Sequence, residues 1–78
     1  MKKRRSIEYW RGADWSTRYG EELRRMRMEA GVTQIALARA IGVDQATLSR
    51  WECGRYRAPK MAVLAARYLL EHGMQVEV

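Results

Sequence analysis

Glycine residues and helix-capping residues divide this chain into short helical segments. Gly31, Gly42 and Gly54 each follow a stretch whose apolar residues recur at three- and four-residue spacing. Thr33 and Asp44 come directly after two of these stretches, and their side chains are suited to cap the N-terminus of a helix. The pattern therefore predicts an all-α domain of four to five short helices joined by tight turns.

The spacing places the predicted helices at about 16–30, 34–41, 45–53 and 59–72. We expect residues 1–15 to form a basic and aromatic N-terminal segment, residues 16–73 the domain, and residues 74–78 a C-terminal tail. The apolar stripes of the first, second and last helices comprise Leu23, Met26, Arg27 and Ala30, then Leu37, Ala38 and Ile41, and finally Met61 or Ala62, Leu64, Ala65, Tyr68 and Leu69.

The link between the second and third predicted helices is very short. Gly42 ends one helix, Val43 bridges, and Asp44 caps the next. Two helices that cross so closely require a small residue in the first helix, a residue that tolerates positive φ in the turn, and bulky apolar anchors in the second helix. These requirements are met by Ala38, Gly42, Leu48 and Trp51. The spacing therefore predicts a helix-turn-helix.

The residue types that most enzyme sites need are scarce in this chain. Cys53 is the single cysteine and His72 the single histidine, so no intramolecular disulfide can form and the chain has no Cys/His set for a zinc site. The nine acidic residues are scattered along the chain, as on a solvated surface. We therefore expect a protein that is not an enzyme and that needs no metal or cofactor.

The chain of 78 residues has a formal net charge of +6, and lysine occupies only positions 2, 3 and 60. Arginine presents a planar fork of donors that fits phosphates and base edges, so the excess favours a nucleic-acid partner. No segment approaches the roughly 20 apolar residues of a membrane span, and the basic N-terminus is not followed by an apolar run. We expect a soluble cytoplasmic protein associated with the nucleoid, without a membrane partner.

Residues 19 to 70 resemble the Cro and repressor-type helix-turn-helix family, also described as lambda-repressor-like or XRE. The resemblance rests on Thr33-Gln34 at the start of a helix, on Leu37-Ala38 and Gly42, and on "SRWECG", which is similar to the family's hydrophobic-Glu-x-Gly close. It implies a protein that binds double-stranded DNA by placing the third predicted helix in the major groove.

The resemblance also implies which residues read bases, namely Gln45, Ala46, Thr47 and Arg50. Gln45 has the chemistry to pair with adenine and Arg50 to pair with guanine, while Ala46 or the methyl group of Thr47 suits a thymine methyl. A phosphate contact is the alternative for Arg50, and a phosphate or backbone contact is the alternative for Gln45.

Phosphate contacts are expected at the start of the second predicted helix and in the loop after the third. The candidates are Gln34, Ser49, Arg55, Tyr56, Arg57 and Lys60. In the family-like arrangement, Arg27 and Glu52 take the places of an internal ion pair. This structural role explains why an arginine interrupts the apolar stripe of the first helix.

The two ends of the chain leave several alternatives open. Lys2 to Arg5 form either an arm that contacts DNA or a solubilising tail, and the aromatic residues Tyr9, Trp10 and Trp15 are expected to cover the domain. A homodimer has three candidate interfaces: the outer side of the last helix with Tyr68, Leu70 and Met74, a strand formed by residues 74–78, or the aromatic N-terminal segment.

These observations predict a transcriptional regulator that binds an inverted-repeat operator as a homodimer. A repressor, including one that silences its own operon, is the default, and a phage or mobile-element regulator is typical of small proteins of this kind. The alternative is an antitoxin or adaptor that uses the same scaffold to bind a partner protein as well as DNA.

Overall fold

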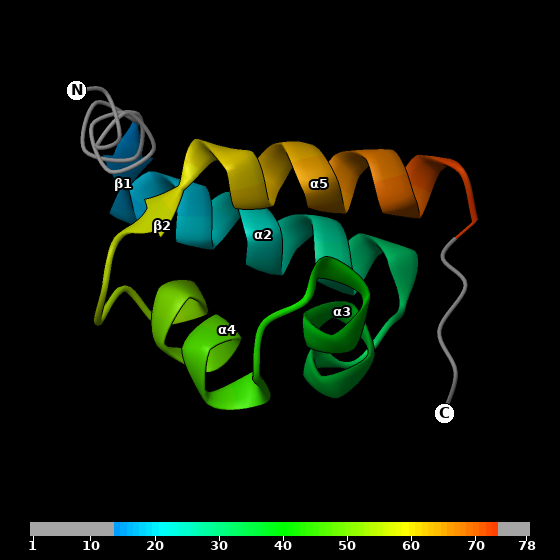
Figure 1. Cartoon of the computed structure of the whole chain (residues 1–78), viewed down its shortest axis with the longest axis horizontal. Helices are drawn as coiled ribbons and strands as arrows, with labels where there is room; N and C mark the ends of the chain where they lie inside the picture. Colours follow the sequence, from blue (N-terminus) through cyan, green and yellow to red (C-terminus); the bar gives the residue numbers. More distant parts are fainter. Residues whose placement is uncertain (1–13, 74–78) are drawn as a thin grey trace, which may run out of the picture.

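The computed structural model describes residues 14–73 of the chain. In chain order, the elements are β1 (Trp15–Ser16), α2 (Thr17–Ala30), α3 (Gln34–Ile41), α4 (Gln45–Glu52), β2 (Ala58–Pro59) and α5 (Lys60–Glu71). Figure 1 shows α2 and α5 lying side by side, with α3 and α4 together on one side of this pair. The predicted all-α class is confirmed. The basic run, Tyr9, Trp10 and the predicted strand at 74–78 lie outside the described residues.

The helix ends follow the local chemistry that the sequence indicated. Ser16, Thr33 and Asp44 each accept a hydrogen bond from a backbone N–H in the first turn of α2, α3 and α4, over 3.0, 3.1 and 2.9 Å. Gly31 and Gly42 follow α2 and α3 with φ of 74° and 88°. The predicted caps and the short turn between α3 and α4 are therefore confirmed.

One buried cluster joins the helices. Leu23, Leu37 and Leu48 are its largest fully buried side chains, and they come from α2, α3 and α4. Smaller residues complete it, namely Ala38, Ala58, Ala62, Val63 and Ala66. Ala38 and Leu48 thus occupy the positions that a close helix crossing requires, while Trp51 and Ile41 pack at the margin of the cluster.

The inner face of α5 differs from the predicted stripe. Val63 and Ala66 are buried with Ala62, whereas Leu64 and Tyr68 are 45% and 62% exposed. The prediction holds for Ala62 and in part for Ala65 and Leu69, which are half-buried, and it is wrong for Leu64 and Tyr68. The buried face of α5 is turned toward its smaller apolar residues, whereas the predicted stripe also followed the larger ones. Ala30 is also exposed, because α2 ends there and Val32 packs against the core instead.

A short antiparallel strand pair joins the start of the described chain to the segment before α5. Trp15 pairs with Pro59 and Ser16 with Ala58, and the backbone N–H of Lys60 donates to the carbonyl of Asp14 over 2.8 Å. The sequence did not predict this pairing, because a strand of two residues is too short to show an alternation of apolar and polar residues. Pro59, predicted inside the first turn of the last helix, instead precedes α5 as its N-cap.

The close approach of α2 and α4 depends on Gly20, which the sequence pattern did not single out. Gly20 is buried in α2, and a Cβ atom built on it would lie 1.8 Å from the backbone carbonyl oxygen of Trp51. The neighbouring atom is part of a helix backbone, so it cannot move aside as the end of a flexible side chain can. The crossing therefore requires a residue without a side chain.

Gly20→Ala is expected to lower the free energy of unfolding by about 3 kcal/mol, at the upper end of the usual range for overpacking. This loss would exceed the gain of about 1 kcal/mol that alanine brings to a helix interior. Urea unfolding followed by circular dichroism measures it. Gly42→Ala is the control, because its Cβ would have no neighbour within 4 Å and only the left-handed backbone would be strained, by about 1–2 kcal/mol. A urea midpoint of Gly20→Ala at or above that of wild type would contradict the close approach of α2 and α4 at Gly20.

Candidate nucleic-acid interface

Helix α4 is fixed to the core on one side and exposed on the other. Leu48 is fully buried and Trp51 is partly buried. Of the predicted base readers, Gln45, Ala46 and Arg50 are exposed and Thr47 is half-buried. Figure 1 places α4 on the side of the molecule away from α5. The structure therefore brings the four predicted readers together on one short helix, with a rigid attachment behind them.

The N-terminus of α4 is held by Asp44. Its carboxylate accepts a hydrogen bond from the backbone N–H of Thr47, and hydrogen bonding to Thr47 lowers the pKa of Asp44 below its usual value. The carboxylate is therefore ionised at neutral pH. Its negative charge lies at the positive end of the helix dipole, which is the favourable arrangement.

An ion pair between Arg27 of α2 and Glu52 of α4 lies behind the exposed face. The Arg27 Nε and Nη2 atoms donate to the two carboxylate oxygens of Glu52 over 2.8 and 2.9 Å, and Nη1 donates to the carbonyl of Val32 over 3.1 Å. The two side chains are 15% and 3% exposed. Hydrogen bonding to Glu52 raises the pKa of Arg27. The arrangement expected from the resemblance therefore forms.

Hydrogen bonds continue from this ion pair to the exposed surface. Gln34 of α3 donates from Nε2 to Oε1 of Glu52 over 3.0 Å, and Gln45 donates from Nε2 to Oε1 of Gln34 over 3.1 Å. A carboxylate only accepts, so Glu52 fixes which end of the Gln34 amide faces Gln45. Gln45 then retains one N–H and its carbonyl oxygen for a ligand. The sequence had assigned Gln34 and Gln45 separate roles and did not predict their contact.

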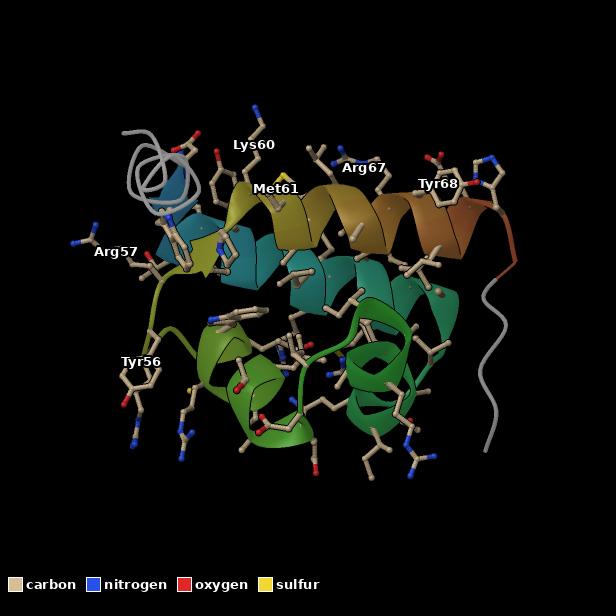
Figure 2. The ribbon with its side chains drawn as sticks, in the orientation of Figure 1. Tyr56, Arg57, Lys60, Met61, Arg67 and Tyr68 are labelled. Atoms are coloured by element: carbon tan, nitrogen blue, oxygen red, sulfur yellow. The ribbon has the colours of Figure 1, made fainter. Side chains whose placement is uncertain are left out.

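The predicted phosphate-binding residues lie in different places. Arg55, Tyr56 and Arg57 are exposed in the loop between α4 and β2, and Figure 2 shows Tyr56 beside α4. In the same view Lys60 projects from α5 on the side opposite to α4. The structure therefore does not bring Lys60 to the face of the molecule that carries α4, and Figure 2 shows Arg57 projecting near β2. Ser49 lies half-buried on α4.

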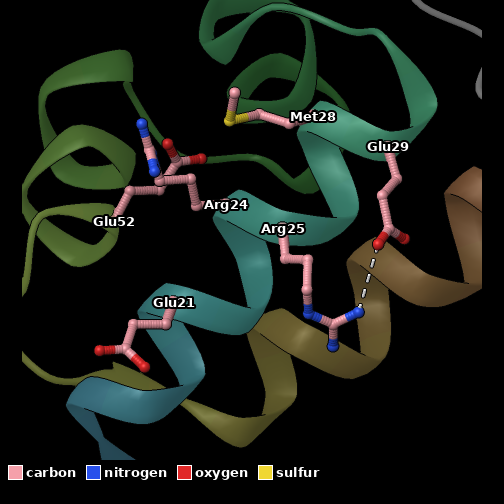
Figure 3. A pocket seen from close by; sticks show the side chains of 6 residues that line it. All are labelled: Glu21, Arg24, Arg25, Met28, Glu29 and Glu52. Carbon is pink, nitrogen blue, oxygen red and sulfur yellow. Dashed lines mark ion pairs between the residues drawn. The ribbon is translucent and has the colours of Figure 1, made fainter.

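A hollow of about 460 Å³ lies between α2 and the end of α4 (Figure 3). It is lined by Glu21, Arg24, Arg25, Met28, Glu29 and Glu52. Arg25 forms ion pairs with Glu22 over 2.7 Å and with Glu29 over 3.6 Å, and the hydrogen bond from Arg25 lowers the pKa of Glu22. Positive and negative side chains both line the hollow, and several of them form ion pairs. The hollow therefore has no excess of one charge that would attract a charged ligand.

Within residues 14–73, no group of three or more His, Cys, Asp or Glu side chains is placed to hold a metal ion. No helix in the same range is long and apolar enough to cross a membrane.

Comparison with known proteins identifies one family. A family model described as a helix-turn-helix domain matches residues 18–69 of the 78-residue chain. The match contains α3, α4 and the loop that follows them. No curated protein and no solved structure matched the chain.

Glu52→Ala is expected to lower the free energy of unfolding by about 3–5 kcal/mol, because Arg27 would keep a largely buried charge without its carboxylate partner. Chemical denaturation measures the loss. Glu29→Ala, which breaks an exposed pair, is the control and should change stability by less than about 1 kcal/mol. The double variant Arg27→Met with Glu52→Leu should recover much of the loss. Equal effects of Glu52→Ala and Glu29→Ala would contradict the structural role of the ion pair.

Proposed function

The chain belongs to the helix-turn-helix domain family, and we propose that it is a sequence-specific regulator of transcription that binds double-stranded DNA. The observation that carries the proposal is the fixed attachment of α4. Leu48 anchors this helix in the core, and Glu52 ties it to α2 and α3. A polar helix face held in this way is suited to enter the major groove. The chain acts by binding and not by catalysis.

Base reading is assigned to Gln45, Ala46, Thr47 and Arg50. The free N–H and carbonyl oxygen of Gln45 match N7 and the N6 amino group of adenine. The Arg50 guanidinium offers two parallel donors to O6 and N7 of guanine. Ala46 and the methyl group of Thr47 suit the methyl group of thymine.

Phosphate binding is assigned to the residues that flank α4. Arg55 and Arg57 are exposed cations in the following loop, and the N-terminus of α3 offers backbone N–H groups beside Gln34. Ser49 is a further candidate on α4. Lys60 is left out because it projects from the opposite side of the molecule. These contacts would position the domain and make its affinity depend on salt.

We further propose a homodimer that binds an inverted repeat in the nucleoid and represses transcription by occluding the promoter, including that of its own gene. Paired recognition helices would enter major grooves about 34–36 Å apart. The exposure of Leu64 and Tyr68 on α5, at 45% and 62%, supports an interface with a second copy.

The second candidate function is an antitoxin or adaptor that also binds a partner protein. A hollow of about 170 Å³ beside α5 favours it, since its lining is apolar. The lining residues are Ile41, Val43, Trp51, Pro59, Met61, Ala62 and Ala65. Co-purification of a stoichiometric protein partner would support this candidate.

Selection of binding sites from random duplex DNA, read by sequencing, tests the proposed function. The expected result is an inverted repeat with fixed spacing between half-sites. Enrichment of a single half-site would remove the homodimer from the proposal. No enrichment would contradict sequence-specific binding.

Arg50→Ala is expected to weaken binding to the selected operator by roughly tenfold or more and to abolish preference at one base pair per half-site. Arg57→Ala, the matched control, should weaken specific and nonspecific binding alike and lower the salt slope by about one unit. Fluorescence anisotropy at several salt concentrations measures both. A uniform loss in Arg50→Ala would make Arg50 a phosphate contact, and an unchanged slope in Arg57→Ala would remove its phosphate role.

A further inference from the structure

We infer that Tyr56 is a specificity-determining residue that orients the Arg50 guanidinium for base reading, an inference that rests on the proposed function of α4. The guanidinium carbon of Arg50 lies 5.9 Å from the centroid of the Tyr56 ring. At this distance the electron-rich face of an aromatic ring attracts a cation. Tyr56 is thereby assigned a role other than the phosphate contact that the sequence indicated.

The backbone brings this ring to Arg50. Gly54 has φ of 81°, a left-handed conformation that glycine adopts readily and that turns the chain back at the end of a helix. The backbone N–H groups of Arg55 and Tyr56 then both donate to the carbonyl of Arg50, over 2.9 and 3.3 Å. Tyr56 is therefore fixed by its backbone to the residue whose side chain it contacts.

The position of the Tyr56 ring is not explained by core packing. The side chain is 57% exposed and lies outside the buried cluster formed by the described residues. Figure 2 shows it projecting beside α4. The other strongly exposed tyrosine, Tyr68, stacks on His72 with ring centroids 4.1 Å apart, near the end of α5. The two tyrosines therefore differ in the partner that their rings contact.

A cation–π contact with the ring suits an arginine that reads guanine. An exposed arginine samples many rotamers, and ordering it on binding is entropically unfavourable. The aromatic ring attracts the guanidinium without accepting a hydrogen bond from its N–H groups, so these donors stay available for O6 and N7. Tyr56 would thus reduce the entropy lost on binding without occupying the donors that recognise the base.

The test compares Tyr56→Phe with Tyr56→Leu on duplexes selected by the wild-type chain from a random library and on duplexes with single base-pair changes. Tyr56→Phe keeps the ring and should bind as wild type. Tyr56→Leu should reduce the preference at the base pair read by Arg50 about two- to fivefold. Nonspecific affinity and salt slope should not change, because tyrosine carries no charge. Met28→Ala, at a similarly exposed side chain of α2 (56%), is the control and should leave all preferences unchanged.

Two further measurements distinguish orientation of Arg50 by the Tyr56 ring from other roles of Tyr56. Combined with Arg50→Ala, Tyr56→Leu should have no additional effect, since the residue acts through Arg50. In the DNA-free chain, the side-chain NMR signals of Arg50 should show a ring-current shift in wild type and Tyr56→Phe, and none in Tyr56→Leu. Thermal unfolding of each variant verifies that it is folded.

Several results would overturn the inference. Equal losses in Tyr56→Phe and Tyr56→Leu would identify the hydroxyl as the active group, as in a phosphate contact. Positioning by the ring would be excluded if Tyr56→Leu kept the base preference of wild type. It would also be excluded by an additive loss when Tyr56→Leu is combined with Arg50→Ala, or by the absence of a ring-current shift in wild type. If the wild-type chain selects no sequence, the proposed function fails together with the inference. If a motif is selected and Tyr56→Leu reads it normally, only the inference fails.

Discussion

The carboxylate of Glu52 connects the packing of the helices to the orientation of the exposed surface. It belongs to α4, accepts hydrogen bonds from Arg27 of α2 and Gln34 of α3, and its side chain is only 3% exposed. A buried charge is tolerated only when it is paired and hydrogen-bonded. Displacing any one of the three helices would leave Glu52 incompletely satisfied, so this group holds them in one arrangement. Gln45 is oriented by the same group through Gln34.

The sequence predicted those parts of the fold that depend on local chemistry. Thr33 and Asp44 cap the helices that follow them, and Gly42 turns the chain between them, because a cap or a left-handed residue acts on its immediate neighbours. Leu37 and Leu48 were placed in the core by helical spacing. The contact between Arg27 and Glu52, 25 residues apart in sequence, came from a family resemblance, since no local pattern specifies a partner at that separation.

The features that were missed all depend on how helices and strands approach one another. In the sequence, Gly20 is only a residue of low helix propensity, and its role follows from the backbone of α4 that packs against it. Val63 and Ala66 of α5 are buried while Leu64 is exposed, because the face of α5 that meets the core is set by the placement of the other helices and not by the spacing of apolar residues within α5 alone. In the candidate site, the bond between Gln34 and Gln45 joins two helices that the sequence interpreted separately.

The two side chains with the strongest chemistry for base reading are each held by a partner from outside α4. Gln45 at its start is bonded to Gln34 of α3, and Arg50 near its end lies over Tyr56 of the following loop. At about 1.5 Å per residue, these two proposed readers are separated by roughly 7.5 Å along the helix axis, which is about two base-pair steps at 3.4 Å each. Both partners are uncharged, so they can order the readers without adding nonspecific attraction to phosphates. Specificity can then be adjusted separately from the salt-dependent affinity assigned to the arginines of the loop.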